Sequence, residues 1–237
     1  MTPISAPWQS EPTTQALMRA LEDAGYQAFF VGGCVRNALL DAPVSDVDIS
    51  TSARPPDVMR IASDAGFKAH HTGIDHGTVT VATGTTSLEV TTFRRDVETD
   101  GRRAVVTYAD SIEDDALRRD FTMNAIYATR AGCLVDPLGG LADLVARRVR
   151  FIEDAEQRIR EDYLRILRFF RFFAHYGDPA DGLDAEGLAA CAALSDGLER
   201  LSKERIGAEM LKLLSFKELG SASPITAWRT RMTFRAP

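Results

Sequence analysis

The sequence predicts an α+β fold, in which a mixed sheet with helices over residues 1–150 precedes an all-helical region over 151–215. Two observations carry this prediction. Short apolar and period-two segments alternate with segments of helical period up to about residue 150, which is typical of a sheet covered by helices. From about Asp154 to Leu214 only helical periodicity remains. Residues 216–237 follow neither period, so an irregular tail is predicted there.

Turn residues and apolar spacing define the individual elements of the first region. Glycines follow two of the predicted helices, and a proline pair opens one of them. The predicted elements are, in chain order, a helix over 12–24, a buried strand over 26–31, a short helix after Gly32-Gly33, a strand over 47–50, a helix from Pro55 to Gly66, and strands over 67–71, 77–83 and 87–93.

Two further segments differ in their patterns. Residues 94–104 are densely charged and lack an apolar period, which predicts a mobile loop. Residues 156–177 have the spacing of one long helix with a buried stripe. The residues predicted for that stripe are Ile159, Tyr163, Ile166, Leu167, Phe170 and Ala174.

Composition excludes several classes of protein. A formal net charge of −6 argues against a protein that coats nucleic acid by bulk electrostatics, although a local basic groove remains compatible with it. The sequence contains no run of eighteen apolar residues, so no membrane span is predicted. The first residues lack the features of a secretory signal, and three widely spaced cysteines indicate reduced thiols. We therefore expect a cytoplasmic protein.

Two motifs of the first region suggest phosphoryl-transfer chemistry. Gly32-Gly33 stands between a strand and a helix, where backbone amides and Arg36 can approach a phosphate. Asp46 and Asp48 are two residues apart, so a strand would project both carboxylates to one face, where Mg²⁺ would relieve their repulsion. Each motif alone is usually an ordinary turn, but their succession is the layout of a two-metal site.

Further polar residues extend this candidate site. Glu89, between apolar neighbours in a predicted strand, is either a third carboxylate or an ordinary outward-facing glutamate. Arg119 is positioned to hold a triphosphate, while Asp120 and Asn124 can hydrogen-bond a ribose hydroxyl. Read alone, the segment that carries these three residues is merely the start of a capped helix.

Charged residues on the predicted long helix allow two interpretations. Glu161, Arg165 and Arg168 lie at helical spacing with Asp162 beside them. Residues 147–171 contain eight arginines and five acids, a net charge of +3 in an acidic chain. A surface ladder of ion pairs is the usual explanation. The alternative is that a fixed arginine and carboxylate read the hydrogen-bonding edge of a base.

The motifs that carry a family resemblance are, in chain order, VGGCVRNALL with SDVDIST, LEVTTFR, RRDFTMNA, VDPLGGLADL, EDYLRILRFFRF and LSKERIGAE. Together they resemble the class II tRNA nucleotidyltransferase and poly(A) polymerase family over about residues 28–214. The resemblance implies a polymerase-β-like nucleotidyltransferase head, followed by a helical neck that selects the nucleotide.

The resemblance also implies roles for single residues. Asp46 and Asp48 would bind the catalytic Mg²⁺ ions, and Gly33, Arg36 and Arg119 would contact the incoming triphosphate. Within the neck, Asp162 and Arg165 would select CTP or ATP, and the residues lining the same pocket would be Arg168 and Arg171. The partners expected from the resemblance are the 3′ end of tRNA, CTP and ATP. The sequence does not predict an oligomeric state.

Within the family, the sequence favours CCA addition. The Gly-Arg-Arg-Phe stretch of bacterial poly(A) polymerases is replaced here by GIDHGTVTVATG. The segment RRDVETDGRRA resembles the flexible loop of enzymes that add both C and A. The alternatives are 3′ adenylation of the poly(A) polymerase type, or a nucleotide- or RNA-binding remnant with little turnover. The complete set of acidic residues and arginines favours an enzyme.

Two departures from the family pattern concern Asn37 and the C-terminus. Asn37 stands where many relatives have aspartate, which puts a secondary orienting contact in doubt. The last 22 residues do not resemble the helical domains that follow in relatives, so we expect a shortened chain with weakened tRNA binding. Three histidines and an aspartate at 70–76 have no metal role in the resemblance, and we expect none.

Overall fold

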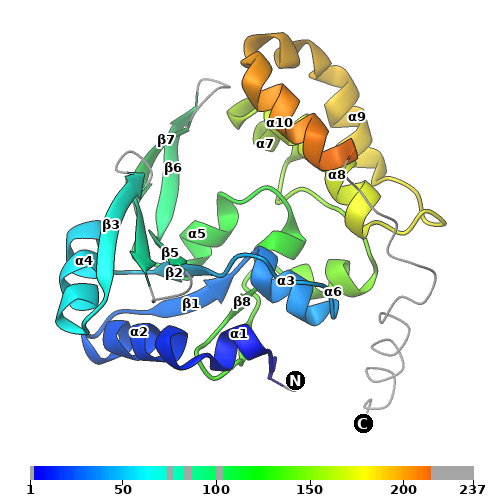
Figure 1. Ribbon diagram of the computed structural model, residues 1–237. Helices are drawn as coiled ribbons and strands as arrows, with labels where there is room; N and C mark the ends of the chain where they lie inside the picture. The colour runs from blue at the N-terminus through cyan, green and yellow to red at the C-terminus, as the bar shows by residue number, and fades with distance from the viewer. Residues whose placement is uncertain (1–2, 74–76, 83–86, 100–103, 215–237) are drawn as a thin grey trace. The chain divides into compact units, whose positions relative to one another are not determined.

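A computed structural model describes residues 3–73, 77–82, 87–99 and 104–214. The described chain forms two compact units. The first comprises the described residues within 3–95, 106–118 and 124–138, and the second comprises those within 96–105, 119–123 and 139–214. Sheet and helices in the first unit, and helices in the second, confirm the predicted α+β fold (Figure 1). The predicted division at residue 150 stays a prediction.

The first unit is built on a seven-stranded sheet with the order β3-β4-β5-β2-β1-β8-β9. β2 and β5 pair in parallel, and the other neighbours pair antiparallel. The strands are β1 (Ala28–Val31), β2 (Asp48–Thr51), β3 (Lys68–Gly73), β4 (Thr78–Ala82), β5 (Ser87–Thr92), β8 (Tyr127–Ala128) and β9 (Leu134–Val135). The five predicted strands of this region are therefore confirmed as β1 to β5, with small shifts at their ends, whereas β8 and β9 were not predicted.

Alternation along the central strands separates a buried face of the sheet from a polar face. Ile49 of β2 pairs with Val90 of β5 and Phe30 of β1, and all three side chains are buried. Asp48 and Ser50 project from the opposite face. The side chains of the candidate site on β2 and β5 therefore lie on the face opposite Ile49 and Val90, toward which the buried Tyr127 also projects.

The described part of the first unit contains five α-helices. They are α1 (Pro7–Ser10), α2 (Pro12–Asp23), α3 (Gly33–Leu39), α4 (Pro55–Asp64) and α5 (Ile112–Leu117). α2 packs against α4 and β1, and α4 packs against β3, β4 and β5, so these two helices cover the sheet side by side (Figure 1). The buried residues of α2 and α4 recur at helical spacing, as the sequence predicts.

The second unit is helical in its described part after residue 139. Its helices are α6 (Gly140–Val145), α7 (Ala155–Glu161), α8 (Leu164–Tyr176), α9 (Ala185–Ala193), the 3₁₀ helix η3 (Ser195–Arg200) and α10 (Lys203–Leu214). Its core includes Phe121, which precedes the 3₁₀ helix η2 (Thr122–Asn124). The Phe121 ring lies 4.9 Å from the rings of Phe151 and Phe172. The segment 119–123 is thereby packed into the helical unit.

The predicted single helix over 156–177 is wrong. The backbone at Asp162 is extended, with φ −153° and ψ 105°, which ends α7 and separates it from α8. The Asp162 carboxylate accepts a hydrogen bond from the Leu164 amide at 3.1 Å, so it satisfies a donor at the start of α8. A short side chain that bonds its own backbone favours such a break over helix continuation.

This break changes which side chains form the buried stripe. Ile159 and Ile166 are buried as predicted, but Ala174 is exposed. In α8 the other fully buried side chains are Phe169 and Phe172, which the predicted stripe did not include.

The predicted loop over 94–104 is also wrong in part. The chain forms two strands there, β6 (Arg94–Thr99) and β7 (Ala104–Tyr108), which pair with each other in a two-stranded sheet. Backbone pairing in a ribbon does not require an apolar period, so charge density is a poor guide to a loop. Residues 100–103 and the predicted irregular tail lie outside the described residues. No helix in the described part of the chain has the length and apolar character that a membrane span needs.

Candidate active site

The two predicted metal-binding aspartates stand at the start of β2. Asp48 is the first residue of the strand and is half-buried, whereas Asp46 precedes the strand and is exposed. The Asp46 carboxylate accepts a hydrogen bond from the Ser45 hydroxyl at 2.7 Å. Because Asp46 lies outside the strand, strand geometry alone does not place its carboxylate, and the prediction that both carboxylates project to one face stays a prediction.

Strand pairing brings Glu89 next to Asp48. In the parallel ladder of β2 and β5, Asp48 is the Cα partner of Glu89, and partners in neighbouring strands are about 4.8 Å apart and share a face. Glu89 is exposed at this position. Its assignment as a third carboxylate of the site stays a prediction, but its place in the ladder is the one that this role requires.

These carboxylates fit a magnesium ion. They are hard oxygen donors, and Mg²⁺ in proteins commonly takes one or two carboxylates and completes its shell with water and substrate phosphates. Asp46 is accessible, and Asp48 is partly so. Within the described ranges no cluster of three or more potential metal-binding side chains exists. A site here would therefore depend on a bound triphosphate for further ligands.

Gly32 and Gly33 join β1 to α3, as the sequence predicts. Gly32 has φ 70° and ψ −124°, a conformation that only glycine adopts without strain. A Cβ atom at Gly33 would lie 3.8 Å from a terminal guanidinium nitrogen of Arg36. The Gly32 amide donates to the Ile126 carbonyl oxygen at 3.4 Å, whereas the absence of a side chain at Gly33 leaves the first turn of α3 next to a guanidinium group, which suits the binding of an anion.

Arg36 is held by the amide side chains of two asparagines. It is 7% exposed, and its guanidinium donates to Oδ1 of Asn37 at 2.9 and 3.1 Å and to Oδ1 of Asn124 at 2.5 Å. Asn37 in turn donates to the Pro43 carbonyl oxygen at 2.7 Å. Both asparagines orient the guanidinium through neutral oxygens. The side chain of Asn124, which was predicted to contact a ribose, is buried and hydrogen-bonded to Arg36 rather than exposed to solvent.

In the helical unit, Asp120 pairs with Arg168. Both Nε and Nη2 of Arg168 donate to the Asp120 carboxylate, the former at 2.8 Å. This carboxylate raises the pKa of Arg168, whose guanidinium also lies 5.3 Å from the centre of the Phe172 ring. Asp120 is buried, and its ribose contact stays a prediction. Arg119 is half-buried immediately before it.

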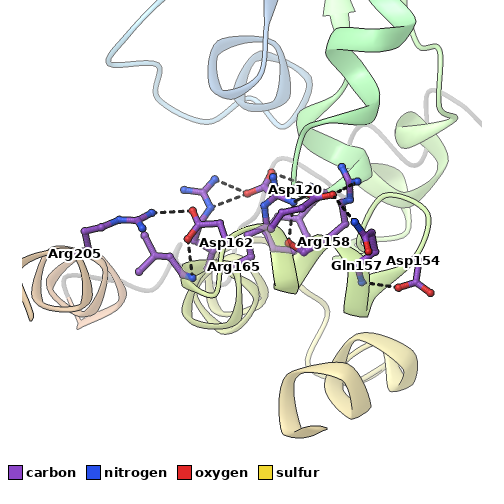
Figure 2. A network of polar contacts seen from close by, with 11 residues as sticks. Asp120, Asp154, Gln157, Arg158, Asp162, Arg165 and Arg205 are labelled. Atoms are coloured by element: carbon purple, nitrogen blue, oxygen red, sulfur yellow. Dashed lines mark hydrogen bonds and ion pairs between the residues drawn. The ribbon is translucent and has the colours of Figure 1, made fainter. Parts of the chain in front are cut away.

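Glu161 is a buried carboxylate between two arginines. Its side chain is 3% exposed, and it forms ion pairs with Arg158 and, at 2.6 Å, with Arg165. Arg165 also donates to the Arg158 carbonyl oxygen at 3.0 Å (Figure 2). The spacing of Glu161 and Arg165 predicted this pair. Arg168 contacts Asp120 rather than joining the pair.

Helix α10 contacts two further residues predicted to select the nucleotide. Arg205 donates to the Asp162 carboxylate at 2.8 Å (Figure 2), and Glu209 forms an ion pair with Arg171. Arg205 and Glu209 are four residues apart, so they lie on one face of α10. Arg205, Glu209 and Arg158 were not among the site residues predicted from the sequence. The charges of Arg205 and Glu209 at helical spacing in LSKERIGAE were the available signal.

The expectation that the histidine segment has no metal role stays a prediction. His70 and His71 lie in β3, and His70 is exposed. Asp75 and His76 lie outside the described residues. Cys34 and Cys191 are buried free thiols, while Cys133 is an exposed one.

Known proteins share both the motifs and this architecture. The family model described as "Poly A polymerase head domain" matches residues 28–150. A CCA-adding enzyme of Leuconostoc citreum is 42% identical over 202 residues, which are 84% of this chain and 48% of that protein. The crystal structure of the Bacillus stearothermophilus CCA-adding enzyme in complex with CTP superposes with a TM-score of 0.76 at 39% identity, over 92% of this chain and 52% of that one.

A second similar structure is a tRNA nucleotidyltransferase complexed with a primer tRNA and an incoming ATP analog. It has a TM-score of 0.67 and 28% identity, over 84% of this chain and 58% of that one. These likenesses confirm the predicted polymerase-β-like head. The chain spans about half the length of the curated relatives it matches.

Proposed function

The chain belongs to the family of the poly(A) polymerase head domain, and from this premise we propose that it adds C, C and A to tRNA 3′ ends from CTP and ATP without a nucleic-acid template. Enzymes of this family are metal-dependent nucleotidyltransferases. Relatives at about 40% identity are CCA-adding enzymes, and solved relatives bind CTP, an ATP analog and tRNA. The proposal places the reaction in the cytoplasm, where three free thiols stay reduced.

The observation that carries the proposal is the alignment of Asp48 with Glu89 on the polar face of the sheet, with Asp46 exposed beside them. Asp46 and Asp48 would hold Mg²⁺. Bound there, two Mg²⁺ ions would activate the 3′-hydroxyl of the RNA and neutralise charge on the triphosphate. Glu89 adds negative potential on the same face, which favours a divalent cation.

Arg36 and the two glycines would bind the triphosphate. The oxygens of two asparagines fix the orientation of the positively charged guanidinium. A fixed cation binds phosphate without the entropy loss of ordering a flexible side chain, and Gly33 places no side chain of its own beside it. This arrangement supports binding of the nucleotide next to the carboxylates of the same unit.

Asp162 and Arg165 would choose the nucleotide. Each is fixed by an ion pair, with Arg205 and Glu161 respectively. A fixed carboxylate accepts from an exocyclic amine, and a fixed guanidinium donates to a carbonyl oxygen or ring nitrogen. Cytosine and adenine both offer an amine donor beside a ring acceptor. Uracil and guanine do not offer that pair, so the same two side chains would accept CTP and ATP and reject UTP and GTP.

Transfer of labelled CTP to a tRNA that lacks its terminal CCA, in the presence of Mg²⁺, tests the proposal. The chain should extend the tRNA, and Asp46→Ala or Asp48→Ala should abolish extension. Glu89→Gln should have a smaller effect, and a wild-type rate would remove Glu89 from the site. The proposal fails if the wild-type chain binds CTP and Mg²⁺ but extends no RNA.

A further inference from the structure

Asp115 is a buried carboxylate to which the proposed mechanism gives no role. It lies on α5 and is 0% exposed, the lowest value for any acidic residue in the described part of the chain. Burial of a charge is costly unless hydrogen bonds replace water. Oδ2 of Asp115 accepts from the hydroxyls of Ser50 at 3.1 Å and Tyr127 at 2.9 Å. Oδ1 accepts from the Arg94 amide at 3.4 Å and from Arg118 Nε at 3.2 Å.

The Ser50 contact ties Asp115 to the strand of the candidate metal ligand. Ser50 follows Asp48 by two residues in β2, so both side chains project from one face of the sheet. Phe29 is the ladder partner of Ser50, and Val31, two residues after it in β1, is the partner of Tyr127. Tyr127 therefore projects from that same face. One carboxylate thus fixes β2 and β8 on the polar face.

The Arg118 contact ties Asp115 to the segment that carries a candidate triphosphate ligand. Arg118 ends α5, and its side chain is 18% exposed against the fully buried Asp115. Arg119 is the next residue in the chain. An ion pair that holds Arg118 in place also limits the backbone motion of its neighbour Arg119. Through these contacts Asp115 holds Ser50, which is close to the proposed metal ligand Asp48, and Arg118, which adjoins the proposed phosphate ligand Arg119.

We propose that Asp115 is a positioning residue for nucleotidyl transfer, which fixes β2 for metal binding by Asp48 and the end of α5 for phosphate binding by Arg119. This inference rests on the proposed function, since it concerns the same site. Replacing a residue that orients metal ligands without binding the metal itself typically lowers metal affinity or activity by about 10–100-fold. A residue that only stabilises the fold would leave metal affinity unchanged in the folded protein.

Asp115→Asn is the test variant, because its amide can donate to the two hydroxyls and its oxygen can still accept from Arg118. Asp143→Asn is the matched control. Asp143 is also a buried carboxylate, 5% exposed, which pairs with Arg150 at 2.8 Å and accepts from a threonine hydroxyl at 2.7 Å. It lies in the helical unit, as does its partner Thr122.

Binding of Mn²⁺, followed by electron paramagnetic resonance in the presence of CTP, is the primary readout. Asp115→Asn should weaken Mn²⁺ binding and lower kcat for CTP transfer, each by about tenfold or more. Asp143→Asn should lose comparable thermal stability and keep the wild-type Mn²⁺ affinity. If Asp115→Asn does not fold, Ser50→Ala decides the question. It retains the carboxylate and should still weaken Mn²⁺ binding severalfold.

Two results would overturn the inference. Wild-type Mn²⁺ affinity in folded Asp115→Asn, or in Ser50→Ala when the former does not fold, would leave Asp115 a structural residue only. Equal weakening in Asp115→Asn and Asp143→Asn would show a general effect of lost stability. Failure of the proposed function is distinguishable, because the wild-type chain would then bind Mn²⁺ and transfer no nucleotide.

Discussion

Removing the charge of Glu161 perturbs the proposed nucleotide-selecting residues most directly. The Glu161 side chain is 3% exposed, and its two arginine partners are each 12% exposed. Loss of one partner from a buried ion pair costs about 3–5 kcal/mol. Because Glu161→Gln keeps one acceptor oxygen, we expect the free energy of unfolding to fall by the lower value of this range, about 3 kcal/mol. For a chain of this length that corresponds to a fall in Tm of about 6–12 °C.

Glu156→Gln is the control on the same helix, α7. Glu156 forms its ion pair with Arg160 at the surface, where both side chains are about half exposed. Such pairs contribute about 0–1 kcal/mol, so Tm should fall by no more than about 4 °C. Thermal denaturation of both variants measures the difference. Equal shifts would refute the view that burial makes the Glu161 network strong.

The same variant tests nucleotide choice. Without the glutamate charge, Arg165 loses its fixed orientation, and discrimination worth about 1–3 kcal/mol should decline by about 5–150-fold. Competition among the four nucleoside triphosphates measures this ranking. An unchanged ranking in a destabilised Glu161→Gln would show that the network is structural and that the base is read elsewhere.

Three other perturbations test separate parts of the account. Asp46→Ala and Asp48→Ala should keep the wild-type Tm within about 3 °C while transfer is lost, because neither side chain is in the core. In Gly140→Ala, a new methyl group would lie 2.0 Å from a backbone carbonyl oxygen, so urea denaturation should show a loss of about 1–3 kcal/mol or more. Gly207→Ala, in open space on α10, should instead stabilise by about 0.5–1 kcal/mol. Burial raises the pKa of the Cys34 thiol from 9.0 to about 11. The free energy of unfolding should therefore be highest below pH 9 and decline as the pH rises from 9 to 11, by about 1.4 kcal/mol at pH 10. Cys34→Ala should remove that decline between pH 8 and 10, and an identical decline in both proteins would contradict the assignment.

Local patterns predicted the elements of the fold because they are set by neighbouring residues. Gly32 has a positive φ at the end of a buried strand, and prolines open α4, as their intrinsic preferences require. The same holds for the alternation in β4 and β5, where period two reports one buried face. The pair of Glu161 and Arg165 followed from spacing alone, although a helix break separates them.

Long-range pairing explains what the sequence could not predict. Asp48 and Glu89 are far apart in the chain, and their parallel pairing depends on the order of the strands in the sheet. The hydrogen bonds of Asp115 to Ser50 and Tyr127 join three separate elements, so no local pattern reveals them. At Asp162, a side-chain hydrogen bond outweighed a helical pattern that had looked continuous.

The sequence of the nucleotides added to an RNA end tests the central claim most directly. A tRNA lacking its CCA end, and an acceptor-stem minihelix with the same end, would be incubated with the chain, Mg²⁺ and all four triphosphates. Mass spectrometry of the product would identify each added residue. We expect C, C and A, then termination, on both RNAs, because the proposed reaction takes place at the 3′ end, which the two RNAs share. A run of adenosines, or incorporation of U or G at the rate of C, would contradict it.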